Sequence, residues 1–286
     1  MRLKNKLLYA IAAVCIWLTA LPALAGVMIF PNRIEFSDKA RSASVSLVNS
    51  SEKTITYRMF WREVRMQEDG SFLDVTEEEP GDNWLSPYVR FSPRQIILKP
   101  GDRQKIRLAL RVPNDLPDGE YRSHLILQEA DVEEPNDVEP PREDLVKEGL
   151  IGAVAKAQLG MSMPVIFRKG DLTSNIAISD VKLRFNEDKS RVYVSTALGK
   201  QGEKSVYGSL YYYWVPQEGA EPVEIARVLG IAIYSQNDKR QVTFDTEFKG
   251  EIDLTRGFIK TVYKKRNSDE IFTETLQPIG SVLVSG

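Results

Sequence analysis

Few of the residue types that perform catalysis occur in a useful pattern. His124 is the only histidine of the 286 residues, so no histidine cluster can hold a metal and no serine–histidine arrangement can be built without it. The sequence also lacks the Gly-x-Ser-x-Gly, Walker and dinucleotide-binding fingerprints. The acidic run Glu77–Glu79 offers carboxylates for a hydrolase, but such a run is more typical of a solvated loop. The sequence therefore favours a protein that is not an enzyme and that needs no cofactor or metal.

The first 25 residues have the pattern of a secretory signal. A basic start is followed by an apolar stretch and then by Ala23-Leu24-Ala25, which fits the small residues that signal peptidase requires. The apolar stretch that begins at Leu7 is nearly long enough for an uncleaved membrane anchor, but Pro22 and the small-residue exit favour cleavage. We therefore expect residues 1–25 to be a signal peptide and the mature protein, starting at Gly26, to lie in the periplasm.

The rest of the chain is long enough for two ordinary domains. Cys15, the only cysteine, lies inside the signal, so the mature protein would be stabilised by its hydrophobic cores without disulfides. Removing the three basic residues of the signal lowers Lys+Arg from 38 to 35 against 40 Asp+Glu, a net charge of −5. This charge gives no general affinity for nucleic acid, and no later segment is apolar enough for stable membrane insertion.

Short alternating runs of apolar and polar residues fill the chain from Met28 onward, separated by Asn, Asp, Gly, Ser and Pro. This pattern predicts antiparallel strands with one buried and one solvated face. The sequence Lys99-Pro-Gly-Asp102 predicts a turn between two such runs. The strands expected in the first half are Ser42–Val48, Ile55–Trp61, Ile106–Leu110 and Tyr121–Gln128.

A joint between two domains is expected at Arg168–Asp171, because strand patterns resume after it. The sequence thus predicts an all-β chain, with an N-terminal domain at 26–169 and a C-terminal β-sandwich at 170–286. The run Tyr211–Trp214 is more typical of core and edge packing than of a ligand cage. The strands expected in the second half are Ile176–Leu183, Val192–Leu198, Tyr207–Val215 and Val242–Phe248.

One long alternating segment follows an acidic one. Residues 129–148 are rich in Asp, Glu and Pro and are expected to form an exposed loop, since no sheet would bury them. The next residues predict a single strand, longer than the usual length of about five or six residues. On composition alone, an ordinary core strand and a strand with a binding role are both open. The alternating positions are Ile151, Ala153, Ala155, Ala157, Leu159, Met161 and Met163.

Several motifs in the first half resemble the periplasmic pilus-assembly (PapD-like) chaperones, in the order in which that family has them. The resemblance covers Met28–Lys169 and is faint over the second domain. The motifs are Arg33-Ile-Glu-Phe36 and Arg41–Asn49, which resemble the first two strands, then Tyr57, Ser92–Gln95, Leu98–Gly101, Gln104–Leu108 and Gly119–Leu125.

The resemblance implies a fold and a function. The fold is two immunoglobulin-like β-sandwich domains in a boomerang arrangement. The function is that of a chaperone which lends the last strand of its first domain to pilus or fimbrial subunits with an incomplete immunoglobulin-like fold, and which delivers them to an outer-membrane assembly platform, the usher. The donor strand would then be the alternating set Ile151, Ala153, Ala155, Ala157, Leu159 and Met161, and the acidic loop would become ordered on binding.

The resemblance also implies an anchor for the subunit's C-terminal carboxylate. Arg33 matches the family's arginine, whose guanidinium can bind a carboxylate through two parallel hydrogen bonds. The family's partner lysine falls here at Pro164, so that lysine is missing and the chain resembles a divergent branch. Arg122 is the first candidate for the second charge, ahead of Lys156 and Arg168.

The same features suit a rival function. An exported two-domain immunoglobulin-like adhesion or structural surface protein would need the same signal and the same sandwiches. A polysaccharide hydrolase is a more distant alternative. A chaperone is expected in a soluble one-to-one complex with a small subunit, an adhesin on the cell surface, and a hydrolase to lose activity when one carboxylate is replaced.

Overall fold

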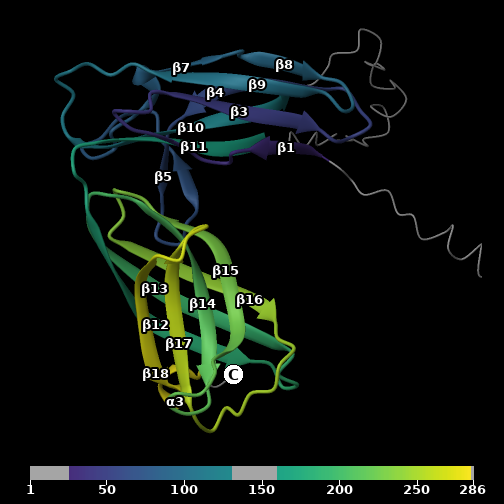
Figure 1. Cartoon of the computed structure of the whole chain (residues 1–286), viewed down its shortest axis with the longest axis vertical. Helices are drawn as coiled ribbons and strands as arrows, with labels where there is room; N and C mark the ends of the chain where they lie inside the picture. The colour runs from purple at the N-terminus through teal and green to yellow at the C-terminus, as the bar shows by residue number, and fades with distance from the viewer. Residues whose placement is uncertain (1–25, 131–159, 285–286) are drawn as a thin grey trace, which may run out of the picture.

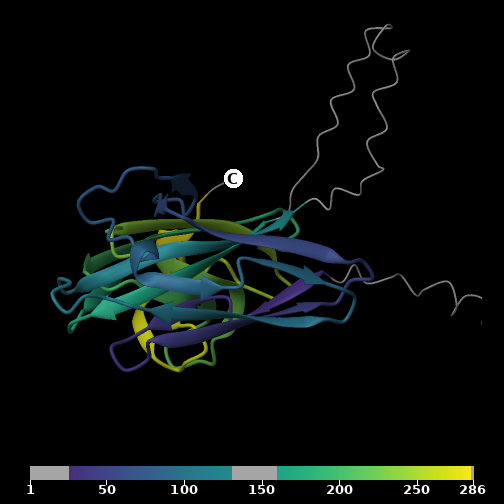
Figure 2. The same cartoon turned by 90° about the horizontal axis from the view of Figure 1, so that it is seen from above.

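The computed structural model describes residues 26–130 and 160–284. The predicted signal peptide at 1–25 lies outside them. Strands make up most of the described chain and nearly all of its regular structure, and they build two β-sandwiches that meet at an angle, like the arms of a boomerang (Figure 1). The view from above places the first sandwich over the second (Figure 2). The prediction of an all-β chain with two sandwiches in a boomerang arrangement is confirmed.

The first sandwich consists of a four-stranded and a five-stranded sheet. Their inner faces carry the alternating apolar residues, with Val45, Leu47, Leu125 and Leu127 fully buried. The first sheet has the order β1 (Val27–Phe30), β3 (Ser42–Asn49), β9 (Arg103–Leu110), β7 (Val89–Ser92). The second has the order β2 (Ile34–Phe36), β11 (Gly160–Lys169), β10 (Gly119–Ala130), β4 (Ile55–Arg62), β8 (Gln95–Leu98).

The chain changes sheets twice at a proline. It leaves the first sheet after β1 and enters the second at β2 through Pro31, and it does so again between β7 and β8 at Pro93. β7 itself follows a short helical turn, η1 (Ser86–Tyr88). Both prolines are preceded by cis peptide bonds. A first strand divided between two facing, largely antiparallel sheets is an immunoglobulin-like arrangement. The predicted turn Lys99–Asp102 connects β8 and β9, with Gly101 at a φ of 79°.

The second sandwich has its own core. Tyr212, Leu210 and Tyr263 are completely buried in it. Its four predicted strands are confirmed, whereas β15, β17 and β18 were not predicted. One sheet has the order β12 (Ser174–Phe185), β13 (Arg191–Gly202), β16 (Lys239–Glu247), and the other β15 (Val223–Ile233), β14 (Val206–Val215), β17 (Phe258–Lys265), β18 (Ile271–Pro278), followed by α3 (Ile279–Val282). Within residues 26–130 and 160–284, no helix has the length and apolar character needed to cross a membrane.

A small hairpin projects from the first sandwich to the second. It consists of β5 (Val64–Met66) and β6 (Phe72–Asp74), and it extends downward from the first domain in Figure 1. The backbone N–H of Gln241 donates to the carbonyl of Glu68 at 2.7 Å, and the side-chain amide of Asn237 donates to the carbonyl of Met66 at 3.0 Å. The hairpin therefore links the two domains along one side of the cleft between them.

Candidate functional site

The first half of β11 has a free edge. Along its whole length β11 pairs with β10, from Gly160 opposite Gln128 to Lys169 opposite Gly119. On its other side, β2 pairs only with Val165–Phe167. Among the described residues, Gly160–Pro164 therefore has a neighbouring strand on one side only. A free strand edge is a template on which another strand can form backbone hydrogen bonds.

The predicted donor strand continues into this free edge. Ile151, Ala153, Ala155, Ala157 and Leu159 lie outside the described residues, so their role stays a prediction. Met161 is in β11, half-buried, and packs against the core of the first sandwich.

The face that Met161 shares is continuous with the domain core. Met163, Val165 and Phe167 continue its alternation and are at most 2% exposed. The described part of the predicted apolar face, Met161 and Met163, thus joins the first hydrophobic core.

A second edge strand exposes apolar side chains. β1 lies at the edge of the facing sheet. Its outward residues Met28 and Phe30 are 60% and 78% exposed. Large apolar side chains exposed next to an open strand edge are a feature of protein-binding surfaces.

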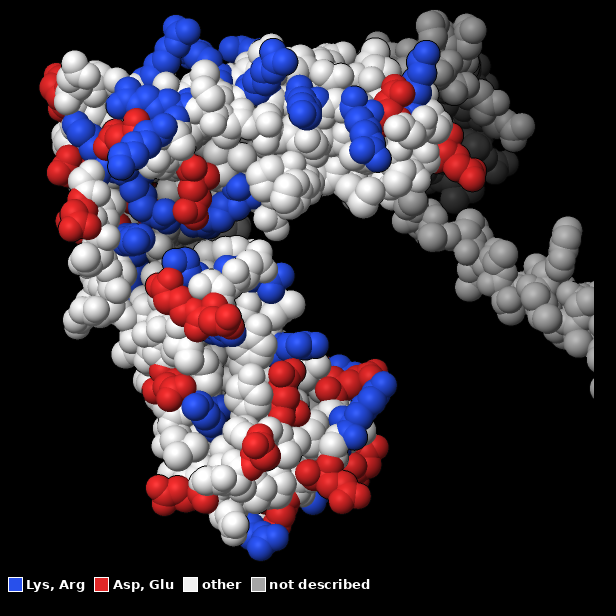
Figure 3. Space-filling view, in the orientation of Figure 1, with Lys and Arg blue, Asp and Glu red and all other residues white. Residues whose placement is uncertain are grey.

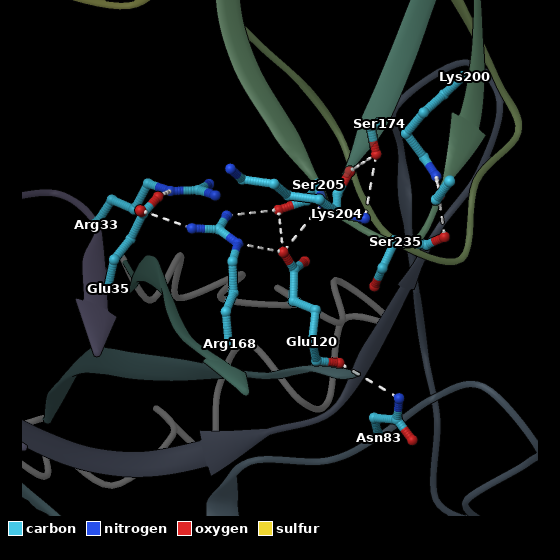
Figure 4. Close-up of polar contacts among 11 residues, drawn as sticks. Arg33, Glu35, Asn83, Glu120, Arg168, Ser174, Lys200, Lys204, Ser205 and Ser235 are labelled. Atoms are coloured by element: carbon cyan, nitrogen blue, oxygen red, sulfur yellow. Dashed lines mark hydrogen bonds and ion pairs between the residues drawn. The ribbon is translucent and has the colours of Figure 1, made fainter. Parts of the chain in front are cut away.

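Arg33 begins a network of ion pairs that leads from the free edge to the second domain (Figure 4). Its Nε donates to Glu35 at 2.6 Å, and Glu35 also accepts from Arg168 at 2.8 Å. Burial alone would raise the pKa of Glu35, but the guanidinium groups of Arg168 and Arg33 outweigh it and hold the pKa below its ordinary value. Glu35 is therefore an ionised link between the two arginines.

Glu120 carries the network across the domain boundary. Its carboxylate is fully buried and accepts from Arg168 at 2.7 Å. The same oxygen accepts from the backbone N–H and the hydroxyl of Ser205, in the second domain, at 3.0 and 2.8 Å. Arg168 also donates to the Ser205 hydroxyl at 3.0 Å. A buried carboxylate that is bonded from both domains orients one domain against the other.

Arg33 itself has unused hydrogen-bonding capacity. Its side chain is only 10% exposed. The guanidinium carbon lies 5.1 Å from the centre of the Tyr207 ring of the second domain, and the Nη2 nitrogen is buried without a hydrogen-bond partner. An unpaired guanidinium nitrogen that is removed from water favours an anionic ligand.

Arg122, the first candidate for the second charge, is also buried, at 4% exposure. Its Nη2 donates to the carbonyl of Val64 at 3.2 Å, and its guanidinium carbon lies 3.7 Å from the centre of the Tyr234 ring. Burial lowers the pKa of Arg122, against the effect of Tyr234 and Glu120. Of the other candidates, Lys156 lies outside the described residues and Arg168 is held by two carboxylates.

A cavity of about 260 Å³ lies between the two domains and the β5–β6 hairpin. Arg33, His124 and Pro164 line it from the first domain and Arg240 from the second. No Asp or Glu is among the residues that line it. Basic side chains gather where the first domain faces the second, at the hollow between the two arms in Figure 3. The cavity therefore suits an anion.

His124 is a neutral member of this cavity. Its Nδ1 lies 2.8 Å from the Ser162 hydroxyl. Burial, followed by the charges of Arg122 and Arg33, lowers the pKa of His124 to about 3. Within the described part of the chain, no group of three or more His, Cys, Asp or Glu residues could hold a metal ion.

Sequence reasoning named Arg33 and Arg122 but missed several other residues of this site. Glu120, Arg122 and His124 occupy alternate positions on the outward face of β10, and all are buried. The unusual signal was the set of polar residues opposite the apolar face of this strand. Ser205 and Arg240 gave no signal, because only the contact between the domains brings them to the cleft.

No family model matches the sequence, and no curated protein matches it. Solved structures of fimbrial and pilus chaperones resemble it at low identity. The YadV chaperone is 12% identical, with a TM-score of 0.43 and 88% of this chain and 98% of that chain covered. A chain of the CsuC–CsuE chaperone–tip adhesion subunit pre-assembly complex from Acinetobacter baumannii is 14% identical, with a TM-score of 0.41 and coverages of 89% and 98%.

A chain of the Salmonella enterica complex of the SafA pilin with the SafB chaperone is 13% identical, with a TM-score of 0.37 and coverages of 90% and 97%. The chain is thus similar to chaperones of pili and fimbriae over most of its length. Its two-sandwich architecture rests on the pairing of its own strands.

Proposed function

We propose that this protein is a periplasmic chaperone that binds and stabilises pilus or fimbrial subunits by donor-strand complementation and delivers them for assembly at an outer-membrane usher. The observation that carries the proposal is the free edge of β11 at Gly160–Pro164. On this proposal residues 1–25 are a signal peptide, residues 26–169 are the capture domain, and residues 170–286 are the second sandwich. The protein acts by binding and has no catalytic activity or cofactor.

The position of β2 defines where a captured strand would end. Ile34 pairs with Val165 in parallel, so Arg33 lies level with Pro164 at the end of the free edge. β1 has already crossed to the other sheet, which leaves the space beside Gly160–Pro164 for a strand of another protein. A captured strand that runs parallel to β11 would end in line with β2, with its terminal carboxylate at Arg33.

The apolar face of β11 supports a shared core. Donor positions from Ile151 to Leu159 would continue the face on which Met161 and Met163 pack. A subunit that lacks one strand would receive this face in its open groove, where it replaces water with apolar contacts. Met28 and Phe30 of β1 would contact the same subunit.

The experiment that tests the proposal is native mass spectrometry of the protein purified from periplasm with its genomic neighbours co-expressed. We expect a small β-rich subunit at equal stoichiometry. Leu159→Asp should lose it, because a charge in an apolar groove costs several kcal/mol in order of magnitude. Leu276→Asp, at a 53% exposed position of the second domain, is the control and should retain it.

Two results would contradict the proposal. Normal recovery of the complex with Leu159→Asp would remove the donor-strand assignment. Recovery of free protein only, with all neighbours folded without it, would favour the adhesion or structural protein.

A further inference from the structure

Arg240 reaches the cleft from the second domain. It lies in β16, and its Nη1 donates to the carbonyl of Glu68 in the hairpin at 3.1 Å. Its Nε is buried without a hydrogen-bond partner. Burial lowers the pKa of Arg240, against the effect of Asp69. The guanidinium is thus held in position, yet one of its donors remains unused.

The hairpin fixes the position of this guanidinium. Gly70 has a φ of 84°, a conformation that side chains rarely adopt. A Cβ atom at Gly70 would lie 1.8 Å from Nη2 of Arg240. The guanidinium therefore occupies the space that a side chain at position 70 would need, and the glycine is what allows the hairpin to pack against it.

Arg33 and Arg240 face one cavity from opposite domains. Both line it, each has a buried guanidinium nitrogen without a partner, and no carboxylate lines the cavity with them. His124 adds no charge, since its pKa lies near 3. Glu35 pairs with Arg33 from outside the cavity lining, so an anion inside the cavity would meet two guanidinium groups and no carboxylate.

We propose that Arg240 is the second cation for the terminal carboxylate of the captured chain, which it holds from the second domain opposite Arg33 of the first. This inference rests on the proposed capture of a strand along β11. It differs from the sequence-based candidate: Arg122 also has a buried nitrogen without a partner, Nη1, but it donates to Val64, stacks on Tyr234 and does not line the cavity. The binding of the chain end then depends on both domains and on the hairpin, so only the docked domain arrangement completes the anchor.

The test measures dissociation of the one-to-one complex for the full-length protein with the co-expressed subunit. Arg240→Met and Arg33→Met should each accelerate dissociation about tenfold or more, as expected when a charged hydrogen bond is lost. In the double variant, dissociation should be accelerated by much less than the product of the two single effects, because both residues hold the same carboxylate. A subunit extended by two residues at its C-terminus should dissociate equally fast from the wild type and from Arg240→Met.

Two glycine variants test whether the position of the Arg240 guanidinium matters as well as its charge. Gly70→Ala keeps Arg240 but displaces its guanidinium, so it should accelerate dissociation in the same direction as Arg240→Met. Gly81→Ala is the matched control, because Gly81 has a φ of 95° and no atom within 4 Å of its added Cβ. It should dissociate like the wild type.

The outcomes distinguish this inference from the function on which it rests. Suppose that the wild type captures a subunit and Leu159→Asp does not, but that the complex of Arg240→Met dissociates at the wild-type rate. Arg240 is then not part of the anchor, although the strand-capture proposal stands. Fully multiplicative effects of Arg33→Met and Arg240→Met would also overturn the inference. If the wild type captures no subunit, the strand-capture proposal itself fails.

Discussion

The guanidinium carbon of Arg122 lies 3.7 Å from the centre of the Tyr234 ring, across the boundary between the two domains. Arg122 belongs to β10, and Tyr234 directly follows β15 in the second sandwich. The Tyr234 side chain also meets Phe72 of the hairpin at a ring separation of 6.1 Å. A desolvated cation over an aromatic face gains about 2 kcal/mol, so this contact helps to hold the domains together.

Replacing Tyr234 should weaken the domain interface. Tyr234→Leu removes the ring over Arg122 and leaves a gap at a position that is 3% exposed, so we expect a loss of about 2–4 kcal/mol in the free energy of unfolding. Urea denaturation measures this loss. Tyr193→Leu is the control, because Tyr193 has the same kind of contact with Arg184, at 4.2 Å, on the more exposed surface of the second domain. Equal losses for the two variants would show that the interface contact has no special weight.

Removing Arg168 should alter the angle between the domains. Arg168→Met takes away the cation between Glu35 and Glu120 and leaves the buried Glu120 carboxylate without its counter-ion. Breaking a buried pair in this way costs about 3–5 kcal/mol. Small-angle X-ray scattering should show a changed domain arrangement, and urea denaturation a lower midpoint.

The control for Arg168→Met is Arg191→Met, which breaks an exposed pair with Asp245. We expect it to leave both the scattering curve and the unfolding midpoint unchanged, because exposed pairs contribute little. An Arg168→Met protein with the scattering curve and midpoint of the wild type would show that the network does not orient the domains.

The strands were predictable because one face of each is buried in its own sandwich. In β10 the positions of Tyr121, Leu125 and Leu127 alternate as a one-sided core pattern requires. The opposite face is buried as well, although it carries polar residues, because the β5–β6 hairpin and the second domain cover it. The sequence Asp69-Gly70 was a signal for the β5–β6 hairpin, but the short strands around it were too irregular in pattern to be recognised.

Of the two proposed binding residues, the sequence pointed to one and not to the other. Arg33 was found because it precedes a strand with a recognisable motif. Arg240 is 207 positions further along the chain and has no motif of its own. Its role depends on the angle between two domains and on the hairpin between them, which are properties of long-range packing. Only the folded chain places both arginines at one cavity.

The single histidine predicts a simple pH dependence of stability. The pKa of His124 falls from 6.5 to about 3 on folding, so the unfolded chain takes up a proton as the pH drops through 6.5 while the folded chain does not. The free energy of unfolding is therefore highest, as far as His124 is concerned, above pH 6.5. It falls by up to about 1.4 kcal/mol per pH unit as the pH drops from 6.5 towards 3. Urea denaturation at pH 7, 6 and 5 measures this slope.

One variant separates the contribution of the His124 imidazole to the pH dependence of stability from the contributions of nearby carboxylates. The lowered pKa of Glu35 makes its own contribution disappear only as the pH falls below about 4.5. Glu63, whose pKa is raised by burial, stabilises the folded state as the pH falls and so opposes the histidine. His124→Gln retains the contributions of both carboxylates, and its unfolding free energy should fall less steeply between pH 6.5 and pH 5 than that of the wild type. Equal slopes, or an imidazole that titrates near pH 6.5 by NMR, would contradict the assignment of a neutral buried His124.

Arg33→Met should weaken subunit capture much more than it weakens the fold. Glu35 keeps its bond to Arg168 at 2.8 Å in this variant, so its carboxylate remains paired and the unfolding midpoint should change little. The captured chain end loses its guanidinium, so the recovery of the one-to-one complex should fall, as native mass spectrometry would show. Arg41→Met breaks an exposed pair with Asp38 in the same domain and should retain normal recovery. A severe loss of thermal stability in Arg33→Met would mean that this arginine supports the fold through Glu35 and Tyr207, and that its unpaired nitrogen is not kept for a ligand.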